Sequence, residues 1–177
     1  MQVATGKSIL NGIAIGPLRI YKKAEAQTTV SSTLTPEEEY ARFDAARVKA
    51  QEQLGVLYDK ALDEVGEDNA AIFEIHQMML DDDDYLDAVR GILETQGATA
   101  EYAASATGEN FAAAFAAMED EYMRARAADV KDISRRVVNV LLGVGDADMM
   151  ADQPAILVAD DLTPSETVQL DKTKLLG

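Results

Sequence analysis

His76 is the only histidine of the 177-residue chain, and the chain has no cysteine. An imidazole can act as a general base or accept a phosphoryl group, but no serine or cysteine nucleophile pattern surrounds His76. A transition-metal site needs further histidine or cysteine ligands, which this sequence does not supply. We therefore expect neither a catalytic nor a metal-binding role for His76 and predict that it is a contact residue on a helix.

The run of aspartates from Asp81 to Asp84 is a second group of residues to consider, as possible ligands of a metal ion. A calcium-binding EF-hand loop alternates its acidic residues and has glycine at position 6 and glutamate at position 12. Here the acids are consecutive and no glycine occupies position 6. Asp82 to Asp84 can instead open a helix, because a helix N-terminus favours negative charge. We predict an acidic helix start that faces a partner, no metal site, and no glycine-rich phosphate loop in the chain.

Methionines gather in the same part of the chain. Met78, Met79, Met118 and Met123 all fall within the predicted helices. Core packing explains many methionines, but this flexible side chain is also favoured at adaptable binding surfaces. Met78 and Met79 lie between His76 and the aspartate run. An apolar patch with an acidic rim suits a basic protein partner.

The charge balance excludes two classes of partner. The chain has 32 acidic and 16 basic side chains, a formal net charge of −16 and a pI of about 4.3. Nucleic-acid binding depends on Lys and Arg that displace counterions from phosphates, so it is not expected, and neither is an anionic membrane surface. The acidity is concentrated in residues 31–142, whose net charge is −14.

Targeting signals are not expected either. No run of 18 apolar residues is present, so we predict no membrane span. Ala24-Glu25-Ala26 resembles a signal cleavage site, but Lys22 and Lys23 separate it from the apolar run at 9–20, so we expect no signal peptide. The lack of cysteine fits a reducing compartment, and we expect a cytoplasmic protein.

The middle of the chain has the periodicity of helices. Thr35 can cap a helix that begins with Pro36, and Glu38 can complete a capping box. Apolar residues then recur every three or four positions, the spacing of one helix face. The predicted helices cover about residues 35–65, 69–80, 82–95, 99–118 and 120–142.

Both ends of the chain differ from the middle. Short apolar runs broken by Gly and Pro predict strands at 8–10, 13–15 and 18–21, and residues 28–33 are predicted to be a linker. Toward the end, a buried strand is predicted at 155–159, a short helix at 163–170 and a strand at 174–177. We therefore predict a mainly α chain in which a helical subdomain, 31–143, is inserted into an α/β part formed by 1–30 and 144–177. The helical part should fold by itself and hold together more firmly than 1–20 and 150–177.

Several sequence strings resemble those of one family. The most specific are Arg-Ala-Ala-Asp-Val at 126–130 and Asp-Leu-Thr-Pro-Ser-Glu-Thr at 161–167. Further matches are Gly-Ile-Ala-Ile-Gly at 12–16, Asp-Glu-Tyr at 120–122 and the stretch 71–80 around His76. In order and spacing the whole chain resembles the N-terminal part of enzyme I of the bacterial phosphoenolpyruvate:sugar phosphotransferase system.

The resemblance implies an architecture and a mechanism. In this family a helical-bundle subdomain that binds the phosphocarrier protein HPr interrupts a phosphohistidine α/β subdomain. The full-length enzyme, a homodimer through its C-terminal domain, binds Mg²⁺ there and passes a phosphoryl group from phosphoenolpyruvate through its own histidine to HPr. That histidine lies in a Gly-Gly-x-Thr-Ser-His motif shortly after Leu-Gly, and this chain ends at Leu176-Gly177. We therefore expect an incomplete α/β subdomain, no catalytic residue, no cofactor and no activity of this chain alone; His76 is not the phosphorylated histidine.

The resemblance also implies a set of HPr-binding residues. Their acidic, apolar and polar side chains would respectively speed the encounter, supply buried area and add hydrogen bonds. Tyr85 and Phe115 fall where the family often has aliphatic residues. The set comprises Glu67, Asp68, Glu74, Asp83 and Asp84 as acids; Ile72, Met78, Met79, Tyr85, Phe115 and Met123 as the apolar patch; and His76 and Arg126 as polar contacts.

Other assignments stay open at this point. The chain could be an acidic helical interaction module with no role in phosphotransfer. It could also derive from the nitrogen-branch enzyme I or from a relative of pyruvate phosphate dikinase. Met1 stands directly before the first predicted strand, which favours the sugar enzyme over the nitrogen form with its extra upstream domain.

Overall fold

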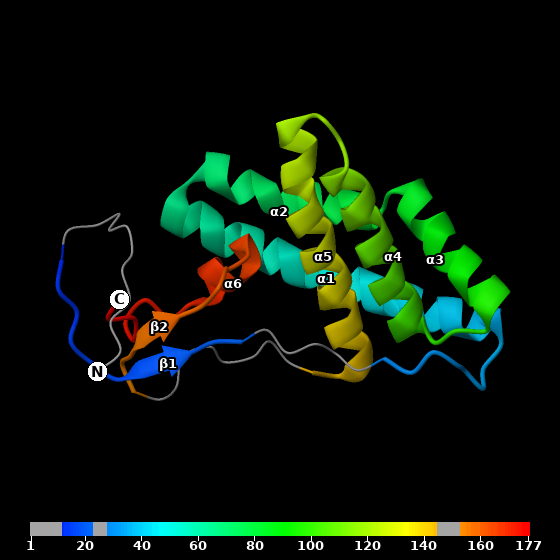
Figure 1. Ribbon diagram of the computed structural model, residues 1–177, viewed down its shortest axis with the longest axis horizontal. Coiled ribbons are helices and arrows are strands. Elements are labelled where there is room, and N and C mark those ends of the chain that lie inside the picture. The colour runs from blue at the N-terminus through cyan, green and yellow to red at the C-terminus, as the bar shows by residue number, and fades with distance from the viewer. Residues whose placement is uncertain (1–11, 23–27, 145–152) are drawn as a thin grey trace. The chain divides into compact units, whose positions relative to one another are not determined.

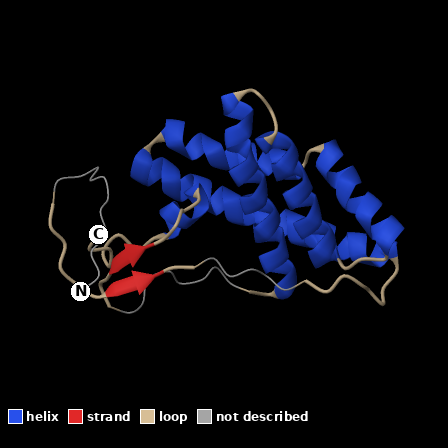
Figure 2. Ribbon diagram, viewed as in Figure 1, coloured by secondary structure: helices blue, strands red, loops and turns tan. Residues whose placement is uncertain are grey.

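The computed structural model describes residues 12–22, 28–144 and 153–177, and helices dominate them (Figures 1 and 2). The described residues form two units: a helical unit of 28–144 and 161–169, and a sheet unit of 12–22, 153–160 and 170–177. The prediction of a mainly α chain with a small α/β part is confirmed. The elements in chain order are β1 (Leu18–Ile20), α1 (Pro36–Val65), α2 (Glu67–Leu80), α3 (Asp83–Gln96), α4 (Ala100–Ala116), α5 (Glu121–Leu142), β2 (Ile156–Val158) and α6 (Pro164–Gln169).

The longest helix, α1, begins with the predicted capping box. The Glu38 amide donates to Thr35 Oγ1 at 3.3 Å, and the Thr35 amide donates to Glu38 Oε2 at 2.9 Å. Each bond satisfies an amide that has no partner inside the helix. One face of α1, from Phe43 to Ala61, is buried at intervals of three or four residues. The helix ends at Gly66, whose φ of 87° suits a residue without Cβ.

Helices α4 and α5 pack closely along their length. A Cβ at Gly108 on α4 would lie 2.5 Å from both Cβ and Oγ of Ser134 on α5, so only glycine allows this approach. Ser134 Oγ is also 2.9 Å from the Tyr85 hydroxyl of α3. The contact therefore joins three helices around one buried polar pair.

Helix α2 is held against α1 by paired side-chain bonds. Gln51 Nε2 donates to the Gln77 carbonyl at 3.2 Å, and Gln77 Nε2 donates to the Gln51 carbonyl at 3.3 Å. Near the end of α2, Asp81 accepts a hydrogen bond from Arg47. The first aspartate of the acidic run thus helps to hold the end of α2 against α1.

The short helix α6 belongs to the helical unit. Thr163 and Glu166 form its capping box, with bonds of 2.7 and 3.3 Å. Val168 joins the core of the helical unit, and Glu166 lies 3.5 Å from Arg135 on α5. The observed division differs from the predicted one here, because residues 161–169 bury an apolar face against the helices instead of joining 144–160.

The sheet unit is small and parallel. Strand β1 pairs with β2 so that Leu18, Arg19 and Ile20 stand opposite Ile156, Leu157 and Val158. Leu175 forms a parallel bridge to Ala155 on the other side of β2, where a strand was predicted at 174–177. The predicted strand at 13–15 is wrong, since these residues belong to no strand or bridge in the described part of the chain, and the one at 8–10 lies outside the described residues.

Residues 28–33 are anchored rather than a free linker. The Ser32 amide donates to the Gly97 carbonyl at 2.9 Å, and the Thr99 amide donates to the Val30 carbonyl at 3.1 Å. These bonds tie the segment to the turn between α3 and α4. Among the residues that the structure describes, no helix is long and apolar enough to cross a membrane.

Candidate protein-docking surface

The predicted binding residues lie on four helices. The acids Glu67, Asp68 and Glu74 are exposed on α2, and Asp83 and Asp84 are exposed in the first turn of α3. None of these five forms an ion pair with another described residue, so their charges remain available to a partner. The apolar members on α2, α4 and α5 are Ile72, Met78, Met79, Phe115 and Met123.

Met78 is the most exposed of the apolar members, at 71 %. Ile72, Met79, Phe115 and Met123 are half-buried. Three of them, all but Met123, pack against the core while keeping part of the side chain in solvent. A thioether that projects beyond partly buried apolar neighbours can enter an apolar depression on another protein.

The aspartate run is divided among three roles. Asp81 pairs with Arg47, and Asp82 is the N-cap of α3, where its Oδ1 accepts from the amides of Asp84 and Tyr85 at 3.0 and 3.3 Å. All four aspartates are exposed, but only Asp83 and Asp84 have carboxylates that no ion pair or cap bond to another described residue engages. No group of three or more acidic or histidine side chains in the described part of the chain could hold a metal ion.

Two predicted contact residues are corrected by the structure. His76 is fully buried and Tyr85 is 1 % exposed, so neither side chain can touch a partner docked on this surface. Helical spacing explains both positions: His76 shares the buried face of α2 with Phe73 and Leu80, and Tyr85 shares that of α3 with two other apolar residues. Burial raises the pKa of Tyr85 to about 12, against a lowering contribution from its bond to Ser134.

Arg126 is part of a cluster at the start of α5. Its Nη1 donates to Asp129 Oδ2 at 2.9 Å, and its Nη2 donates to the Tyr122 hydroxyl at 2.5 Å. The guanidinium carbon also lies 4.5 Å from the centre of the Tyr122 ring, within cation–π range. The guanidinium is thereby fixed from two sides.

Asp129 was not among the predicted site residues. Its Oδ1 lies 3.5 Å from Nε2 of the buried His76. Burial by itself would raise the pKa of Asp129, but His76 and Arg126 together hold it below its ordinary value. The spacing of three residues between Arg126 and Asp129 is the sequence signal that could have identified this pair.

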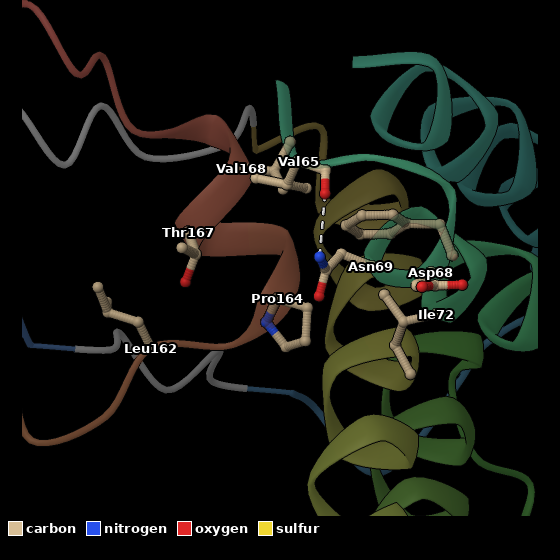
Figure 3. Close-up of a pocket in the computed structure, with 9 residues that line it drawn as sticks. Val65, Asp68, Asn69, Ile72, Leu162, Pro164, Thr167 and Val168 are labelled. Carbon is tan, nitrogen blue, oxygen red and sulfur yellow. Dashed lines mark hydrogen bonds between the residues drawn. The ribbon is translucent and has the colours of Figure 1, made fainter. Parts of the chain in front are cut away.

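A pocket of about 520 Å³ lies beside the acidic start of α2 (Figure 3). Asp68 and Ile72 line it from α2, and Pro164, Thr167 and Val168 line it from α6. Its lining contains no cationic side chain, so it lacks the charge that a phosphate-bearing ligand requires. The pocket therefore fits an extension of the docking surface better than a phosphoenolpyruvate site.

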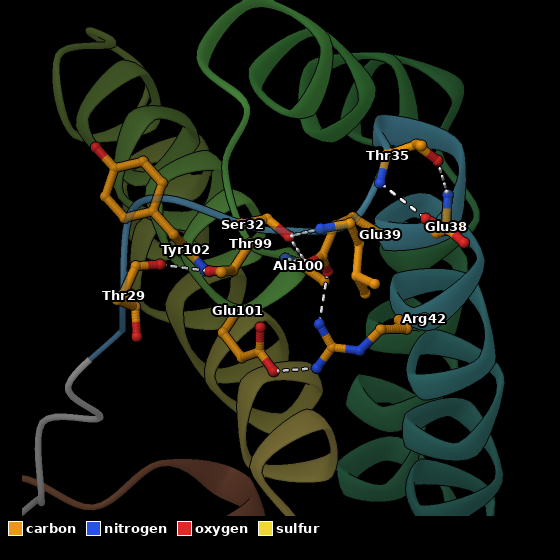
Figure 4. A network of polar contacts seen from close by, with 11 residues as sticks. Thr29, Ser32, Thr35, Glu38, Glu39, Arg42, Thr99, Ala100, Glu101 and Tyr102 are labelled. Atoms are coloured by element: carbon orange, nitrogen blue, oxygen red, sulfur yellow. Dashed lines mark hydrogen bonds and ion pairs between the residues drawn. The ribbon is translucent and has the colours of Figure 1, made fainter.

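A second polar cluster joins α1 to α4 (Figure 4). Arg42 donates to Glu39 at 2.6 Å and to Glu101 at 2.5 Å, and the Ala100 amide donates to Glu39 at 3.0 Å. Burial tends to raise the pKa of Glu39, but its bonds from Ser32, Ala100 and Arg42 lower it on balance. Because its acceptor and donor groups are engaged within the chain, this cluster is structural.

Comparison with known proteins identifies the family. The family model for the PEP-utilising enzyme, N-terminal, matches residues 5–126. Phosphoenolpyruvate-protein phosphotransferase from Bacillus sp. (strain S) is 36 % identical over 173 residues, which are 97 % of this chain and 30 % of that protein. The enzyme of the same name from Bacillus subtilis (strain 168) is 37 % identical over 180 residues, 100 % of this chain and 31 % of that protein. The chain thus spans about 30 % of the length of these curated relatives.

Two solved structures share the fold. The solution structure of an enzyme I protein has a TM-score of 0.75 and 32 % identity, covering 92 % of this chain and 67 % of that one. The N-terminal domain of a nitrogen enzyme I has a TM-score of 0.68 and 25 % identity over the same shares. The chain belongs to the family of N-terminal domains of PEP-utilising enzymes and resembles the N-terminal domain of enzyme I within it.

Proposed function

We propose that the helical unit docks a phosphocarrier protein of the HPr kind, as the N-terminal part of a phosphoenolpyruvate-protein phosphotransferase that serves sugar uptake in the cytoplasm. The observation that carries the proposal is the exposed Met78 among the unpaired acids of α2 and α3. Met78 is 71 % exposed, so a docked partner that covers its side chain gains the free energy of removing this apolar surface from water.

Charge supports a basic partner. Residues 31–142 have a net charge of −14, and the predicted contact acids Glu67, Asp68, Glu74, Asp83 and Asp84 form no ion pairs with other described residues. Such a surface attracts a basic protein over a distance of about a Debye length, ~8 Å at physiological salt. A carrier must also leave after each transfer, which favours an interface of modest area.

The larger chemistry is proposed for the whole enzyme. There a histidine of the α/β part would take the phosphoryl group from phosphoenolpyruvate, with Mg²⁺ bound by a C-terminal domain that also makes the homodimer. This chain would contribute the docking surface and no catalytic residue. Phosphorylation of HPr by the chain alone would contradict this division of roles.

The docking surface can be tested by titrating the 177-residue chain with HPr and following amide shifts by NMR. We expect the shifts to centre on α2 and on the first turns of α3 and α5. Met78→Ala should weaken binding about tenfold, as loss of an interface anchor does. Val56→Ala is the matched control, because Val56 is also an exposed apolar side chain, at 68 %, but lies on α1. Equal effects of the two substitutions would contradict the proposed surface.

The nitrogen-branch relative supports a second candidate partner. The same titration with the nitrogen-branch carrier would compare the two directly. Tighter binding of that carrier would transfer the proposal to the nitrogen branch. Saturable binding of an unrelated basic protein with equal affinity would favour an interaction module with no phosphotransfer role.

A further inference from the structure

His76 is a buried histidine whose ring nitrogens have no hydrogen-bond partner among the described residues. Its Nε2 lies 3.5 Å from Oδ1 of Asp129 on α5. The edge of the Phe73 ring packs against the imidazole, with ring centres 6.0 Å apart. A polar ring in such a place costs stability compared with an apolar one, so packing alone does not account for it.

Asp129 uses its two oxygens for two partners. Oδ1 faces His76 inside the helical unit, and Oδ2 accepts from Arg126 at 2.9 Å. Arg126 in turn bonds to the Tyr122 hydroxyl and stacks on its ring, and Tyr122 is 64 % exposed. A continuous line of contacts therefore runs from the buried face of α2 to the surface of α5.

We infer that His76 is a positioning residue, which holds Asp129 and through it fixes the Arg126 guanidinium and the Tyr122 ring for the docked carrier protein. An Arg–Asp pair three residues apart on an exposed helix is weakly ordered by itself. Here the carboxylate is 88 % shielded from solvent and contacts the neighbouring helix α2, so it cannot rotate away from Arg126 freely. A pre-ordered guanidinium loses less entropy when it binds an acceptor on a partner.

The geometry has a direct spectroscopic consequence. The contact with a carboxylate oxygen requires a hydrogen on His76 Nε2, since a bare nitrogen would place two lone pairs face to face. Because the chain has one histidine, a long-range ¹H–¹⁵N spectrum of the imidazole contains a single set of signals. We expect a protonated Nε2 in the unmodified chain. A bare Nε2 would overturn the inference, and this measurement needs no variant.

Substitutions then separate positioning from packing. His76→Leu keeps an apolar side chain but removes the donor, whereas His76→Gln supplies an amide donor at the same place. Leu80→Val is the matched control, because Leu80 lies on the same buried face of α2, one turn away. The readout is the hindered rotation of the Arg126 guanidinium, seen as separate Nη–H resonances.

We expect His76→Leu to average these resonances and to raise the dissociation constant for HPr about tenfold, the loss of one charge-assisted contact. His76→Gln and Leu80→Val should keep them separate. Equal behaviour of the Leu and Gln variants, or averaging in Leu80→Val, would show that His76 acts only by packing. The consequence for binding rests on the proposed function, but the Arg126 resonances are recorded without a partner. If the unmodified chain fails to bind HPr, the docking proposal is wrong. The Arg126 resonances still test whether His76 positions Asp129 and Arg126.

Discussion

In the helical unit Phe43, Leu54 and Leu93 are completely buried, whereas in the sheet unit Leu18 and Ile20 are 68 % and 67 % exposed. In both units apolar residues recur at the spacing of a helix face or of a strand. The helical unit has enough helices to cover its apolar faces, but β1 and β2 of the sheet unit have three residues each. Two or three short strands cannot cover a sheet face, so such a sheet is marginally stable by itself.

The comparison shows where stability and function reside in this chain. The helical unit has a core of its own and holds every residue of the candidate docking surface. We therefore expect it to fold and to bind independently of the sheet unit.

Hydrogen exchange should divide the chain into two classes. Amides in the buried turns of α1 and α3 should exchange only on global unfolding. The amides of Tyr21 and Leu157, which donate to Val158 and Gly177 at 2.8 Å, should exchange about 1000-fold faster through local opening. Similar protection of the two classes, measured by NMR, would show that the units form one cooperative structure.

Cavity formation should affect the two units unequally. Leu54→Ala removes a completely buried side chain and should cost about 3 kcal/mol of unfolding free energy. Leu18→Ala removes a largely exposed one and should cost less than about 0.5 kcal/mol. Chemical denaturation followed by far-UV circular dichroism measures both, and a larger loss from Leu18→Ala would reverse the comparison.

Alkaline pH should destabilise the helical unit through Tyr85. The folded state binds the phenol proton more tightly than the unfolded chain, because burial raises the pKa of Tyr85 from 10.0 to about 12. The stabilisation is complete below pH 10 and is lost as pH rises through 12, a change of roughly 2 to 3 kcal/mol. Tyr85→Phe should flatten this part of the stability profile. Tyr102→Phe, at a half-buried tyrosine on α4, should leave the loss of stability with rising pH unchanged.

Two helical glycines should respond oppositely to alanine. At Gly108 the new Cβ would lie 2.5 Å from Ser134, so Gly108→Ala should cost about 1 to 2 kcal/mol in spite of the better helix propensity of alanine. At Gly91 nothing lies within 4 Å, and Gly91→Ala should stabilise α3 by about 0.5 to 1 kcal/mol. Thermal melting measures the stability of both variants. A higher melting temperature for Gly108→Ala would mean that α4 and α5 can move apart at little cost in free energy.

Loss of a helix cap should have a small effect that stays within the helical unit. Thr35→Ala removes the acceptor for the Glu38 amide and should cost about 1 kcal/mol, whereas Thr35→Ser should restore most of it. The loss should appear in the exchange of α1 amides and not in those of β2. A similar change in the exchange of the β2 amides would show that the two units unfold as one cooperative structure.

Local sequence signals predicted the helices well. The capping boxes at Thr35 and Thr163, and the N-caps at Asp82, Thr99 and Asp120, all lie where the helices begin. These signals work because a cap and a repeating apolar face depend on neighbours within a few residues. The strand prediction at 13–15 failed because a strand needs a partner from elsewhere in the chain.

The docking residues were predicted by resemblance, and helix periodicity could have refined the set. Positions 76 and 85 continue the apolar spacing of α2 and α3, so His76 and Tyr85 could be expected to face inward. Helical spacing could also have paired Arg126 with Asp129 and Tyr122, three and four residues away, but it could not have joined this cluster to His76 on another helix. Their roles depend on the side-chain geometry at the start of α5.

Local sequence features were sufficient to predict the helical class, the helix boundaries to within about two residues, and the acidic and methionine-rich character of the surface. They were sufficient because caps, periodicity and charge are local properties. Tertiary structure decided that residues 161–169 join the helices, that His76 and Tyr85 are buried, and that His76 faces Asp129. These outcomes depend on which helix faces meet, and residues as far apart in sequence as 76 and 129 come together only when the core forms.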